Sequence, residues 1–546
     1  CTRRRSRSEP KVLNGANTEA AETQRRSVCL AGGFSVLNAF GFSRAPWFWL
    51  AALIVFRLWF SVALPMTGDE AYFVLWGEHP AGGYYDHPPM VGWWLSGLLA
   101  VGRAEWLLRL PVLLLPLVLA ACAWWLVRPH GADRARGAAA LVLLQPANVW
   151  NVLITTDTPV ILFSMLSVLA YIAALRSAGY ARRALAWHAL AGLLLGMAFL
   201  GKYFSALLGI AYLAHVLFIR RDRGRWGGFV FLLLAALPAP IYNLWWNSGH
   251  CWVNVLFNFL NRNTDSGFSV TNPALYVLSI FYLATPWVLL ALFRQRGGVR
   301  LALRDSAAAG AVFWLMAIPL GLLGLMSLWR SIGLHWLVSF IPLIAVLAAI
   351  AVPRDTLQRL LRWSAVFAGV HVLIVILISV LPMQLWRSNK LYDGIVMTVR
   401  ADEVIAQLEP YAADYLFATG SYSSSATLAY NADRPFAVFG GGSFHARQDD
   451  FLTDWRAQDG RNVLILQKGA RNVPDAADYA PYFSRVELRQ FELHGVRFDV
   501  VLGQGFNYAV YRDQVLAHVR ERFYQIPAWL PQHGCEFCER YFPDER

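Results

Sequence analysis

Long apolar runs separated by short arginine clusters constrain the fold of this chain more than any other feature. Eleven runs can be drawn, each near the length of about 20 residues that a helix needs to cross a bilayer. They cover residues 46–65, 106–127, 138–154, 158–175, 186–201, 204–219, 228–246, 274–293, 307–328, 333–352 and 364–385. Charged residues make up 15% of the chain, whereas soluble domains average about 25%. The pattern predicts a polytopic α-helical membrane protein.

The distribution of basic residues predicts how these spans are threaded. With alternate threading, one set of loops holds 17 arginines, and the opposite set holds only Arg103, Lys202, Arg262 and Arg330. Cytoplasmic loops are the ones enriched in Lys and Arg. We therefore expect a cytoplasmic N-terminus and an external C-terminus, and we attribute the net charge of +13 to topology rather than to nucleic-acid binding.

Three regions follow from these patterns. Residues 1–45 are rich in arginine and lack a long apolar core, so we expect a disordered cytoplasmic extension or a cloning remnant rather than a signal peptide. Residues 46–385 form the transmembrane domain, with a first external loop over 66–105. Residues 386–546 form an external α/β domain. The six cysteines are scattered and imply no disulfide framework.

The α/β prediction for the third region is based on short strand-like runs. A helix is expected over Ser421–Tyr430, between the first two of them. The four runs are Tyr415–Thr419, Pro435–Phe439, Asn462–Gln467 and Phe498–Leu502.

Ionisable side chains are concentrated in the first external loop. Asp69 and Glu70 follow the first span directly. A carboxylate at that interface can be partly desolvated, which raises its pKa and its basicity. Asp86 and His87 precede two prolines that stiffen the backbone, and both are possible ligands for a metal or a phosphate group. The alternative is a polar, tightly turned loop whose charges face water.

Three more polar residues lie at the external ends of predicted spans. Lys202 is one of only four lysines in the chain. Its ammonium group could bind a phosphate oxygen, or it could be an interfacial cation that extends toward water. Asp157 begins a span, where it could act as a helix cap. Arg109 lies near the outer end of the second span and could assist with a phosphate.

Five short motifs in this order resemble the GT-C membrane glycosyltransferases, in particular bacterial protein O-mannosyltransferase-like enzymes and the lipid A aminoarabinose transferase. The resemblance covers about residues 46–385 in order and topology. The motifs are Asp-Glu-Ala-Tyr (69–72), Tyr-Tyr-Asp-His-Pro-Pro-Met (84–90), Leu-Arg-Leu-Pro (108–111), Thr-Asp-Thr-Pro (156–159) and Gly-Lys-Tyr (201–203).

The resemblance implies an inverting enzyme in the bacterial cytoplasmic membrane. Such an enzyme moves a sugar from a polyprenyl monophosphate carrier to an external acceptor, which is an envelope glycolipid, another glycan or a protein. It implies that Asp69 is the catalytic carboxylate and Asp157 its partner. A divalent metal ion is a possible cofactor, with Asp86 and His250 as ligands, and no nucleotide or redox cofactor is expected. The remaining site residues expected are Lys202, Arg109, His87 and Tyr203 for the donor phosphate, and Glu70, Tyr85, Arg262 and Arg330 elsewhere in the site.

The chain departs from this pattern at two points. Asp86-His87 stands where the aminoarabinose transferase has Glu-Lys, and Thr-Asp-Thr-Pro stands where relatives often read Thr-Pro-Asp. A transporter or flippase for a lipid-linked saccharide is the alternative, since it would share the cavity and the cations. It would have no use for Asp69 as a base, and the matching broken helices that favour a transporter are not evident in the sequence. A non-catalytic subunit would not need motifs in every external loop.

The charge asymmetry predicts that the chain beyond residue 386 is external. A reporter enzyme that is active only outside the cytoplasmic membrane, fused after Arg387, should be active. Activity of a cytoplasm-only reporter at the same position would contradict the threading.

Overall fold

The computed structural model describes residues 45–177, 181–220, 222, 224–261, 267–445, 447–469 and 473–544. The extension expected over residues 1–45 lies outside these ranges except for its last residue. The chain divides into two compact units, Cys1–Val55 and Phe56–Arg546. The described part of the first unit is the start of helix α2 (Ala45–Ala63). All contacts described below lie within the second unit.

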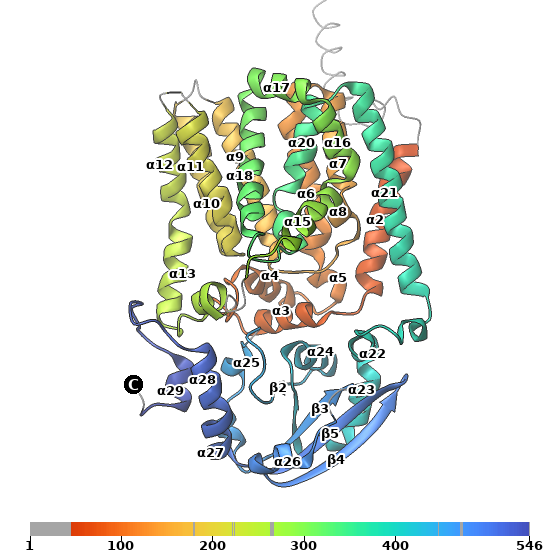
Figure 1. Ribbon diagram of the computed structural model, residues 1–546, viewed down its shortest axis with the longest axis vertical. Helices are drawn as coiled ribbons and strands as arrows, with labels where there is room; N and C mark the ends of the chain where they lie inside the picture. Colours follow the sequence, from red (N-terminus) through yellow and green to blue (C-terminus); the bar gives the residue numbers. More distant parts are fainter. Residues whose placement is uncertain are drawn as a thin grey trace, which may run out of the picture. The chain divides into compact units, whose positions relative to one another are not determined.

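The second unit is helical up to residue 380, and its long helices lie side by side (Figure 1). In order after α2 they are α3 (Gly68–Glu78), α4 (Met90–Leu99), α5 (Glu105–Leu108), α6 (Leu110–Val127), α7 (Ala132–Leu143), α8 (Pro146–Trp150), α9 (Asp157–Arg176), α10 (Ala181–Phe199), α11 (Ala206–Ala214), α12 (Arg225–Ala236), α13 (Pro238–Ser248), α14 (Val253–Val255), the π-helix η4 (Leu256–Asn261), α15 (Thr271–Ala284), α16 (Pro286–Arg294), α17 (Arg296–Asp305), α18 (Ala307–Met326), α19 (Leu334–Leu337), α20 (Ile341–Ala351) and α21 (Arg354–Val380).

The prediction of a polytopic helical membrane protein is confirmed, but the count of eleven spans is not. Among the described residues, five helices are long and apolar enough to cross a membrane, and two bent helix pairs raise the number to at most seven. Breaks in the helices explain the difference. The run expected over 138–154 is divided between α7 and α8 at Pro146, and α15 and α16 meet at an angle of 94° before Pro286. Proline cannot continue the backbone hydrogen bonding of a helix.

Helix α20 lies at the centre of the helical region. All eleven of its residues, Ile341–Ala351, are buried, which is typical of a helix that is apolar on every side and packed by others all round. It packs against α6, α7 and α18. These helices contribute to one apolar cluster that runs through the membrane region.

The arginine-rich loops meet one another in the structure. Arg134 donates to the carbonyl oxygens of Ala349, Ile350 and Val352. In this way it satisfies carbonyls that the end of α20 leaves without helical partners. Arg176 donates to the carbonyl of Leu126 at the end of α6. These contacts place the loops after α6, α9 and α20 together, as the alternate threading requires.

A buried ion pair fixes the first external loop to the helices. Arg109, which is 0% exposed, donates from Nε and Nη2 to the two carboxylate oxygens of Glu70 at 2.9 and 2.7 Å. Glu70 also completes a capping box with Thr67 at the start of α3 and accepts from the amide of Ile154 at 3.1 Å. The remaining donors of the guanidinium group reach Glu105 and the carbonyls of Ser61, Leu64 and Pro65.

The strands expected after residue 386 are confirmed, and they form one mixed sheet. The strands are β1 (Tyr415–Thr419), β2 (Phe436–Val438), β3 (Asn462–Lys468), β4 (Phe483–Leu493) and β5 (Val496–Phe506), in the order β2-β1-β3-β5-β4. β1 pairs in parallel with β2 and β3, and the hairpin β4–β5 adds antiparallel strands at one edge. The sequence did not predict β4, whose residues are mostly exposed.

Helices surround this sheet. The predicted helix after β1 is α24 (Tyr422–Ala432), which packs against α3. The others are α22 (Tyr392–Val399), α23 (Ala401–Leu408), α25 (Asp449–Leu452), α26 (Ala476–Tyr479), α27 (Tyr508–Tyr511), α28 (Ala517–Phe523) and α29 (Glu536–Tyr541).

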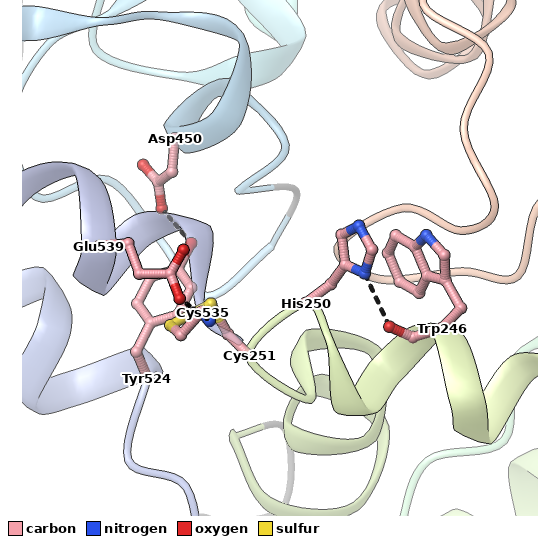
Figure 2. Close-up of a disulfide and its surroundings, with 7 residues drawn as sticks. All are labelled: Trp246, His250, Cys251, Asp450, Tyr524, Cys535 and Glu539. Carbon is pink, nitrogen blue, oxygen red and sulfur yellow. Dashed lines mark hydrogen bonds between the residues drawn. A yellow bond between two sulfur atoms is a disulfide. The ribbon is translucent and has the colours of Figure 1, made fainter. Parts of the chain in front are cut away.

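One disulfide joins the helical region to the end of the chain, which corrects the expectation that the cysteines imply none. Cys251 follows α13 and is bonded to Cys535, 284 residues later (Figure 2). Sequence spacing gave no sign of this pair because the two residues meet only through the tertiary fold. Disulfides form in oxidising compartments, so both residues should face the outside.

Loss of the disulfide should destabilise the attachment of the C-terminal segment. We expect Cys251→Ser to lower the free energy of unfolding by about 2–4 kcal/mol and to increase proteolysis of the chain after residue 525. Thermal unfolding and limited proteolysis in detergent would measure both effects. Cys122→Ser, at a buried cysteine outside the disulfide, is the control, and equal behaviour of the two variants would contradict the bridge.

Removal of the Arg109 guanidinium should impair folding. We expect Arg109→Met to cost about 3–5 kcal/mol, because it leaves Glu70 charged and buried without a partner. Arg103→Gln, which removes a half-exposed cation of the same loop, should stay within about 1 kcal/mol of the wild type. Thermal unfolding in detergent is the measurement. If Arg109→Met remained stable and lost only donor affinity, Arg109 would instead be a ligand of the donor phosphate.

Candidate functional site

Asp69 is an exposed carboxylate at the start of α3. It lies in the first turn of α3, and its Oδ1 accepts a hydrogen bond of 2.9 Å from the hydroxyl of Tyr422 at the start of α24. Burial, and then the charge of Asp69, raise the pKa of Tyr422. The phenol therefore stays protonated and orients the carboxylate as a hydrogen-bond donor. Within the described part of the chain, Oδ2 of Asp69 accepts no hydrogen bond.

Asp86 and His87 form a second acidic and imidazole pair. Asp86 is buried, and its Oδ2 lies 3.3 Å from Nδ1 of His87. Its other oxygen, Oδ1, is buried without a hydrogen-bond partner among the described residues. An unsatisfied buried carboxylate oxygen is costly, so this position favours a bound cation, a water molecule or a hydroxyl group of a ligand.

Amide side chains hold the loop that carries Asp86. Asn254 and Asn258 donate to the carbonyls of Tyr84 and Asp86 at 2.9 and 3.0 Å. From the sheet region, Gln448 accepts from the amide of Tyr85 at 2.9 Å. Sequence reasoning missed these residues. The asparagines at positions 254, 258 and 261 have the spacing of one helix face, and that spacing was the available signal.

Asp157 begins α9 and Lys202 follows the end of α10, and the two side chains face each other. The ammonium of Lys202 lies 3.1 and 3.0 Å from the two oxygens of Asp157, and both side chains are nearly buried. His335 of α19 and His87 act electrostatically on Asp157. A small cavity lined by Asp157 and His335 opens beside the pair. Lys202, which is expected to bind the donor phosphate, thus forms an ion pair with Asp157, the expected partner of Asp69.

The remaining predicted site residues make contacts of their own or lie outside the described residues. Tyr203 donates to Asn243 at 2.6 Å. Tyr85 is buried against Tyr524. Arg330 lies in the turn after α18 and forms no salt bridge with another described residue. Arg262, another predicted site residue, lies outside the described residues.

Arg109, which is expected to assist with the donor phosphate, lies in a buried ion pair. Its guanidinium donors are used by Glu70, Glu105 and backbone carbonyls. Glu70 is 0% exposed and is part of the same buried pair. Both residues position α3 through these buried contacts.

The residues expected to hold a metal do not assemble into a site. Among the described residues, no three Asp, Glu, His or Cys side chains come together as possible metal ligands. His250 stacks on Trp246 with ring centroids 4.2 Å apart, and its Nδ1 contacts the Trp246 carbonyl at 2.7 Å (Figure 2). The donor set therefore does not fit the predicted divalent ion, and the chemistry below uses none.

Five side chains form what we call the external row, namely Asp69, Asp86, His87, Asp157 and Lys202. The row is continuous in electrostatic terms, because Tyr422 experiences the charges of both Asp69 and Asp86, while His87 acts on Asp157. It combines an exposed carboxylate with an ammonium and an imidazole. Such groups can accept a proton at one position and stabilise an anion at another.

Two consecutive aspartates, Asp449 and Asp450, begin helix α25 of the sheet region. Arg447 forms two hydrogen bonds of 2.7 Å with Asp450. Asp450 also accepts a hydrogen bond of 2.8 Å from the hydroxyl of Tyr524 (Figure 2). Burial, followed by the charge of Asp450, raises the pKa of Asp449 to about 7. The sequence offered no signal for this cluster beyond two consecutive aspartates.

Comparison with known proteins supports the resemblance found in the motifs. Residues 86–246 match the family described as dolichyl-phosphate-mannose-protein mannosyltransferase. The segment includes four members of the external row, but not Asp69. A lipid A galacturonosyltransferase, RgtD from Rhizobium johnstonii, is 28% identical over 215 residues. The alignment covers 37% of this chain and 43% of that relative, so the chain spans less than half of the relative's length.

Two solved structures have a similar fold. ArnT from Cupriavidus metallidurans, bound to undecaprenyl phosphate, has a TM-score of 0.55 and 17% sequence identity, with 84% of this chain and 98% of that chain covered. The apo state of the same protein also has a TM-score of 0.55 and 17% identity, with 86% and 98% covered. The predicted resemblance to GT-C membrane glycosyltransferases of this kind is confirmed.

Proposed function

We propose that this protein is an inverting glycosyltransferase that takes a sugar from a polyprenyl monophosphate and passes it to an acceptor outside the cytoplasmic membrane. The observation that carries the proposal is the exposed carboxylate of Asp69, oriented by Tyr422, in one row with the ammonium of Lys202. The similarity to ArnT, whose structure contains undecaprenyl phosphate, supports a donor of this class.

The two ends of the row, Asp69 and Lys202, suggest different roles in catalysis. Asp69 accepts the proton of an acceptor hydroxyl through Oδ2 while Tyr422 keeps Oδ1 in place. The acceptor oxygen then attacks the anomeric carbon, and the bond from that carbon to the phosphate oxygen breaks. Polyprenyl phosphate leaves with the electron pair, and attack from the opposite face inverts the anomeric centre. Positioning and charge stabilisation supply most of the catalysis, because phosphate is already a good leaving group.

Lys202 has two alternative partners in this mechanism. Without donor, its ammonium is held by Asp157. A donor phosphate would compete for that ammonium, aided by His87, and so release the Asp157 carboxylate to orient the acceptor or Asp69. Charged hydrogen bonds to phosphate are among the strong ones in proteins.

Two observations support an external site. The basic loops that should be cytoplasmic lie together at the ends of α6, α9 and α20. The row instead lies with the sheet region, because Tyr422 contacts Asp69 and Gln448 contacts Tyr85 next to Asp86. We place the row on the outer face of the bacterial cytoplasmic membrane. The name of the RgtD relative favours an envelope glycolipid as acceptor.

Asp69→Asn should keep the hydrogen bond from Tyr422 but remove the base. With a hydroxyl acceptor, turnover should fall by about 10²–10⁴-fold with little change in donor affinity. Asp157→Asn should slow turnover less. Glu78→Gln, which alters a surface carboxylate at the end of α3, is the control. A near-normal rate for Asp69→Asn would refute the assignment, provided that the acceptor group is shown to be a hydroxyl and not a phosphate.

Lys202→Ala should weaken the binding of polyprenyl phosphate by about tenfold or more, because a charged hydrogen bond contributes about 1.5–3 kcal/mol. Isothermal titration of the folded variant in detergent is the measurement. Arg103→Gln, at a half-exposed cation that is not among the expected site residues, provides a comparison. Unchanged affinity would reduce Lys202 to an ion-pair partner of Asp157.

Sugar transfer by purified protein distinguishes the enzyme from a transporter or flippase. An enzyme should release polyprenyl phosphate and glycosylated acceptor in detergent solution, where no membrane separates two compartments. Movement of a lipid-linked saccharide across proteoliposomes without any such product would favour the transporter.

A further inference from the structure

A series of asparagine side chains, which we call the asparagine ladder, connects two parts of the external row. Its members are Asn243 and Asn247 of α13, Asn254 of α14 and Asn258 of η4. The first three are at most 1% exposed. A buried amide group costs free energy unless it is hydrogen-bonded within the protein. The hydrogen-bond partners of these side chains therefore indicate what the ladder holds together.

One end of the ladder is attached to the residue that follows Lys202. The hydroxyl of Tyr203 donates to Oδ1 of Asn243 at 2.6 Å. Nδ2 of Asn247 donates to the same oxygen at 3.2 Å and to the backbone carbonyl of Asn243 at 2.8 Å. These contacts fix the backbone next to Lys202 to helix α13.

The other end of the ladder holds the loop that carries Asp86. Oδ1 of Asn247 accepts from the backbone amide of Asn254 at 3.1 Å. The side chain of Asn254 donates to the carbonyl of Tyr84 at 2.9 Å. The side chain of Asn258 donates to the carbonyl of Asp86 at 3.0 Å and to that of Asn254 at 2.9 Å. The ladder thus continues from α13 to the backbone of this loop.

A tight reversal of the chain brings the two halves of the ladder together. Cys251 and Trp252, between α13 and α14, have φ angles of 55° and 53°, a region that residues other than glycine rarely adopt. The amide of Trp252 donates to the carbonyl of Asn247 at 2.9 Å, and Cys251 is held by its disulfide. Such backbone conformations persist where the surrounding structure enforces them, and they are concentrated at functional sites.

The ladder is not built for stability alone. Nδ2 of Asn243 and Oδ1 of Asn254 are buried without a hydrogen-bond partner among the described residues. An unsatisfied buried group destabilises a fold, whereas apolar side chains of the same shape would avoid that cost. The presence of amides at these positions therefore favours a role in the site over a role in folding.

We propose that the asparagine ladder positions the loop of Asp86 and His87 in response to the group that Lys202 binds. A donor phosphate on Lys202 fixes Tyr203, and the ladder then holds His87 where it contacts the same phosphate. The four asparagines are thus positioning residues. The inference rests on the proposed function for the identity of the ligand as a polyprenyl phosphate. A coupling between separate residues has to be measured as such, and two experiments do so.

Hydrogen exchange measures the coupling without turnover. The full-length protein in detergent is compared with Tyr203→Phe, which removes only the hydroxyl at the start of the ladder. The amides of residues 84–87 should exchange about threefold faster or more in the variant. Tyr282→Phe is the matched control, because it removes a half-buried hydroxyl that contacts Trp150 and His371 outside the ladder. Unchanged exchange of this segment in Tyr203→Phe would overturn the proposal.

A double-mutant cycle distinguishes coupling from two local losses. Binding of undecaprenyl phosphate is titrated for Tyr203→Phe, Asn258→Ala and the double variant. Each single change should weaken binding by about threefold or more. The double variant should lie within about twofold of the weaker single variant, because either change breaks the ladder, whereas independent effects multiply to within about twofold. Effects that multiply, or single variants that bind as the wild type, would overturn the proposal.

The two experiments also distinguish this inference from the proposed function. A wild-type protein that does not bind undecaprenyl phosphate would contradict the proposed function, and the exchange measurement would still decide the role of the ladder. If Asn258→Ala fails to fold, the exchange measurement on Tyr203→Phe decides by itself.

Discussion

The buried pair between Arg109 and Glu70 is the contact on which the external site depends. One guanidinium group joins the end of α2, the start of α3 and the start of α6, while Glu70 also holds the segment before α9 through Ile154. Three parts of the chain that carry Asp69, Arg109 and Asp157 are thereby fixed to one another. A charge buried this deeply is tolerated only when its hydrogen bonds are satisfied, which leaves little freedom in how α3 lies over the membrane helices.

The sheet region contributes residues to the site. Tyr422 orients Asp69, and Gln448 bonds both to the backbone of Tyr85 and to the hydroxyl of Tyr72. The disulfide of Cys251 adds a covalent link from the end of α13 to the end of the chain. The matched family segment, residues 86–246, contains neither Tyr422 nor Gln448. The residues of the sheet region that contact Asp69 and Tyr85 thus lie outside the segment that matches that family.

The sequence predicted much of the architecture, and its errors have identifiable causes. The parallel strands β1 and β3 were predicted almost to the residue because buried strands appear as short apolar runs. The count of eleven spans is not confirmed, because apolar length alone does not reveal helix breaks such as those at Pro146 and Pro286. Arg57, an arginine within the first span, donates to the backbone carbonyls of Val112 and Asn148, and no local pattern indicates these distant partners.

By itself, the sequence determined the membrane class, the grouping of the basic loops, the α/β character of the C-terminal region and the resemblance to glycosyltransferases, since each depends on local composition or on motif order. Only the tertiary structure decided which charges neutralise one another. Arg109 and Lys202 look alike in sequence, as single cations near the outer ends of spans. Arg109 is enclosed by Glu70 and carbonyl oxygens, whereas Lys202 meets a single carboxylate beside a cavity. Partners 39 and 45 residues away make that difference, and no local pattern encodes contacts at such separations.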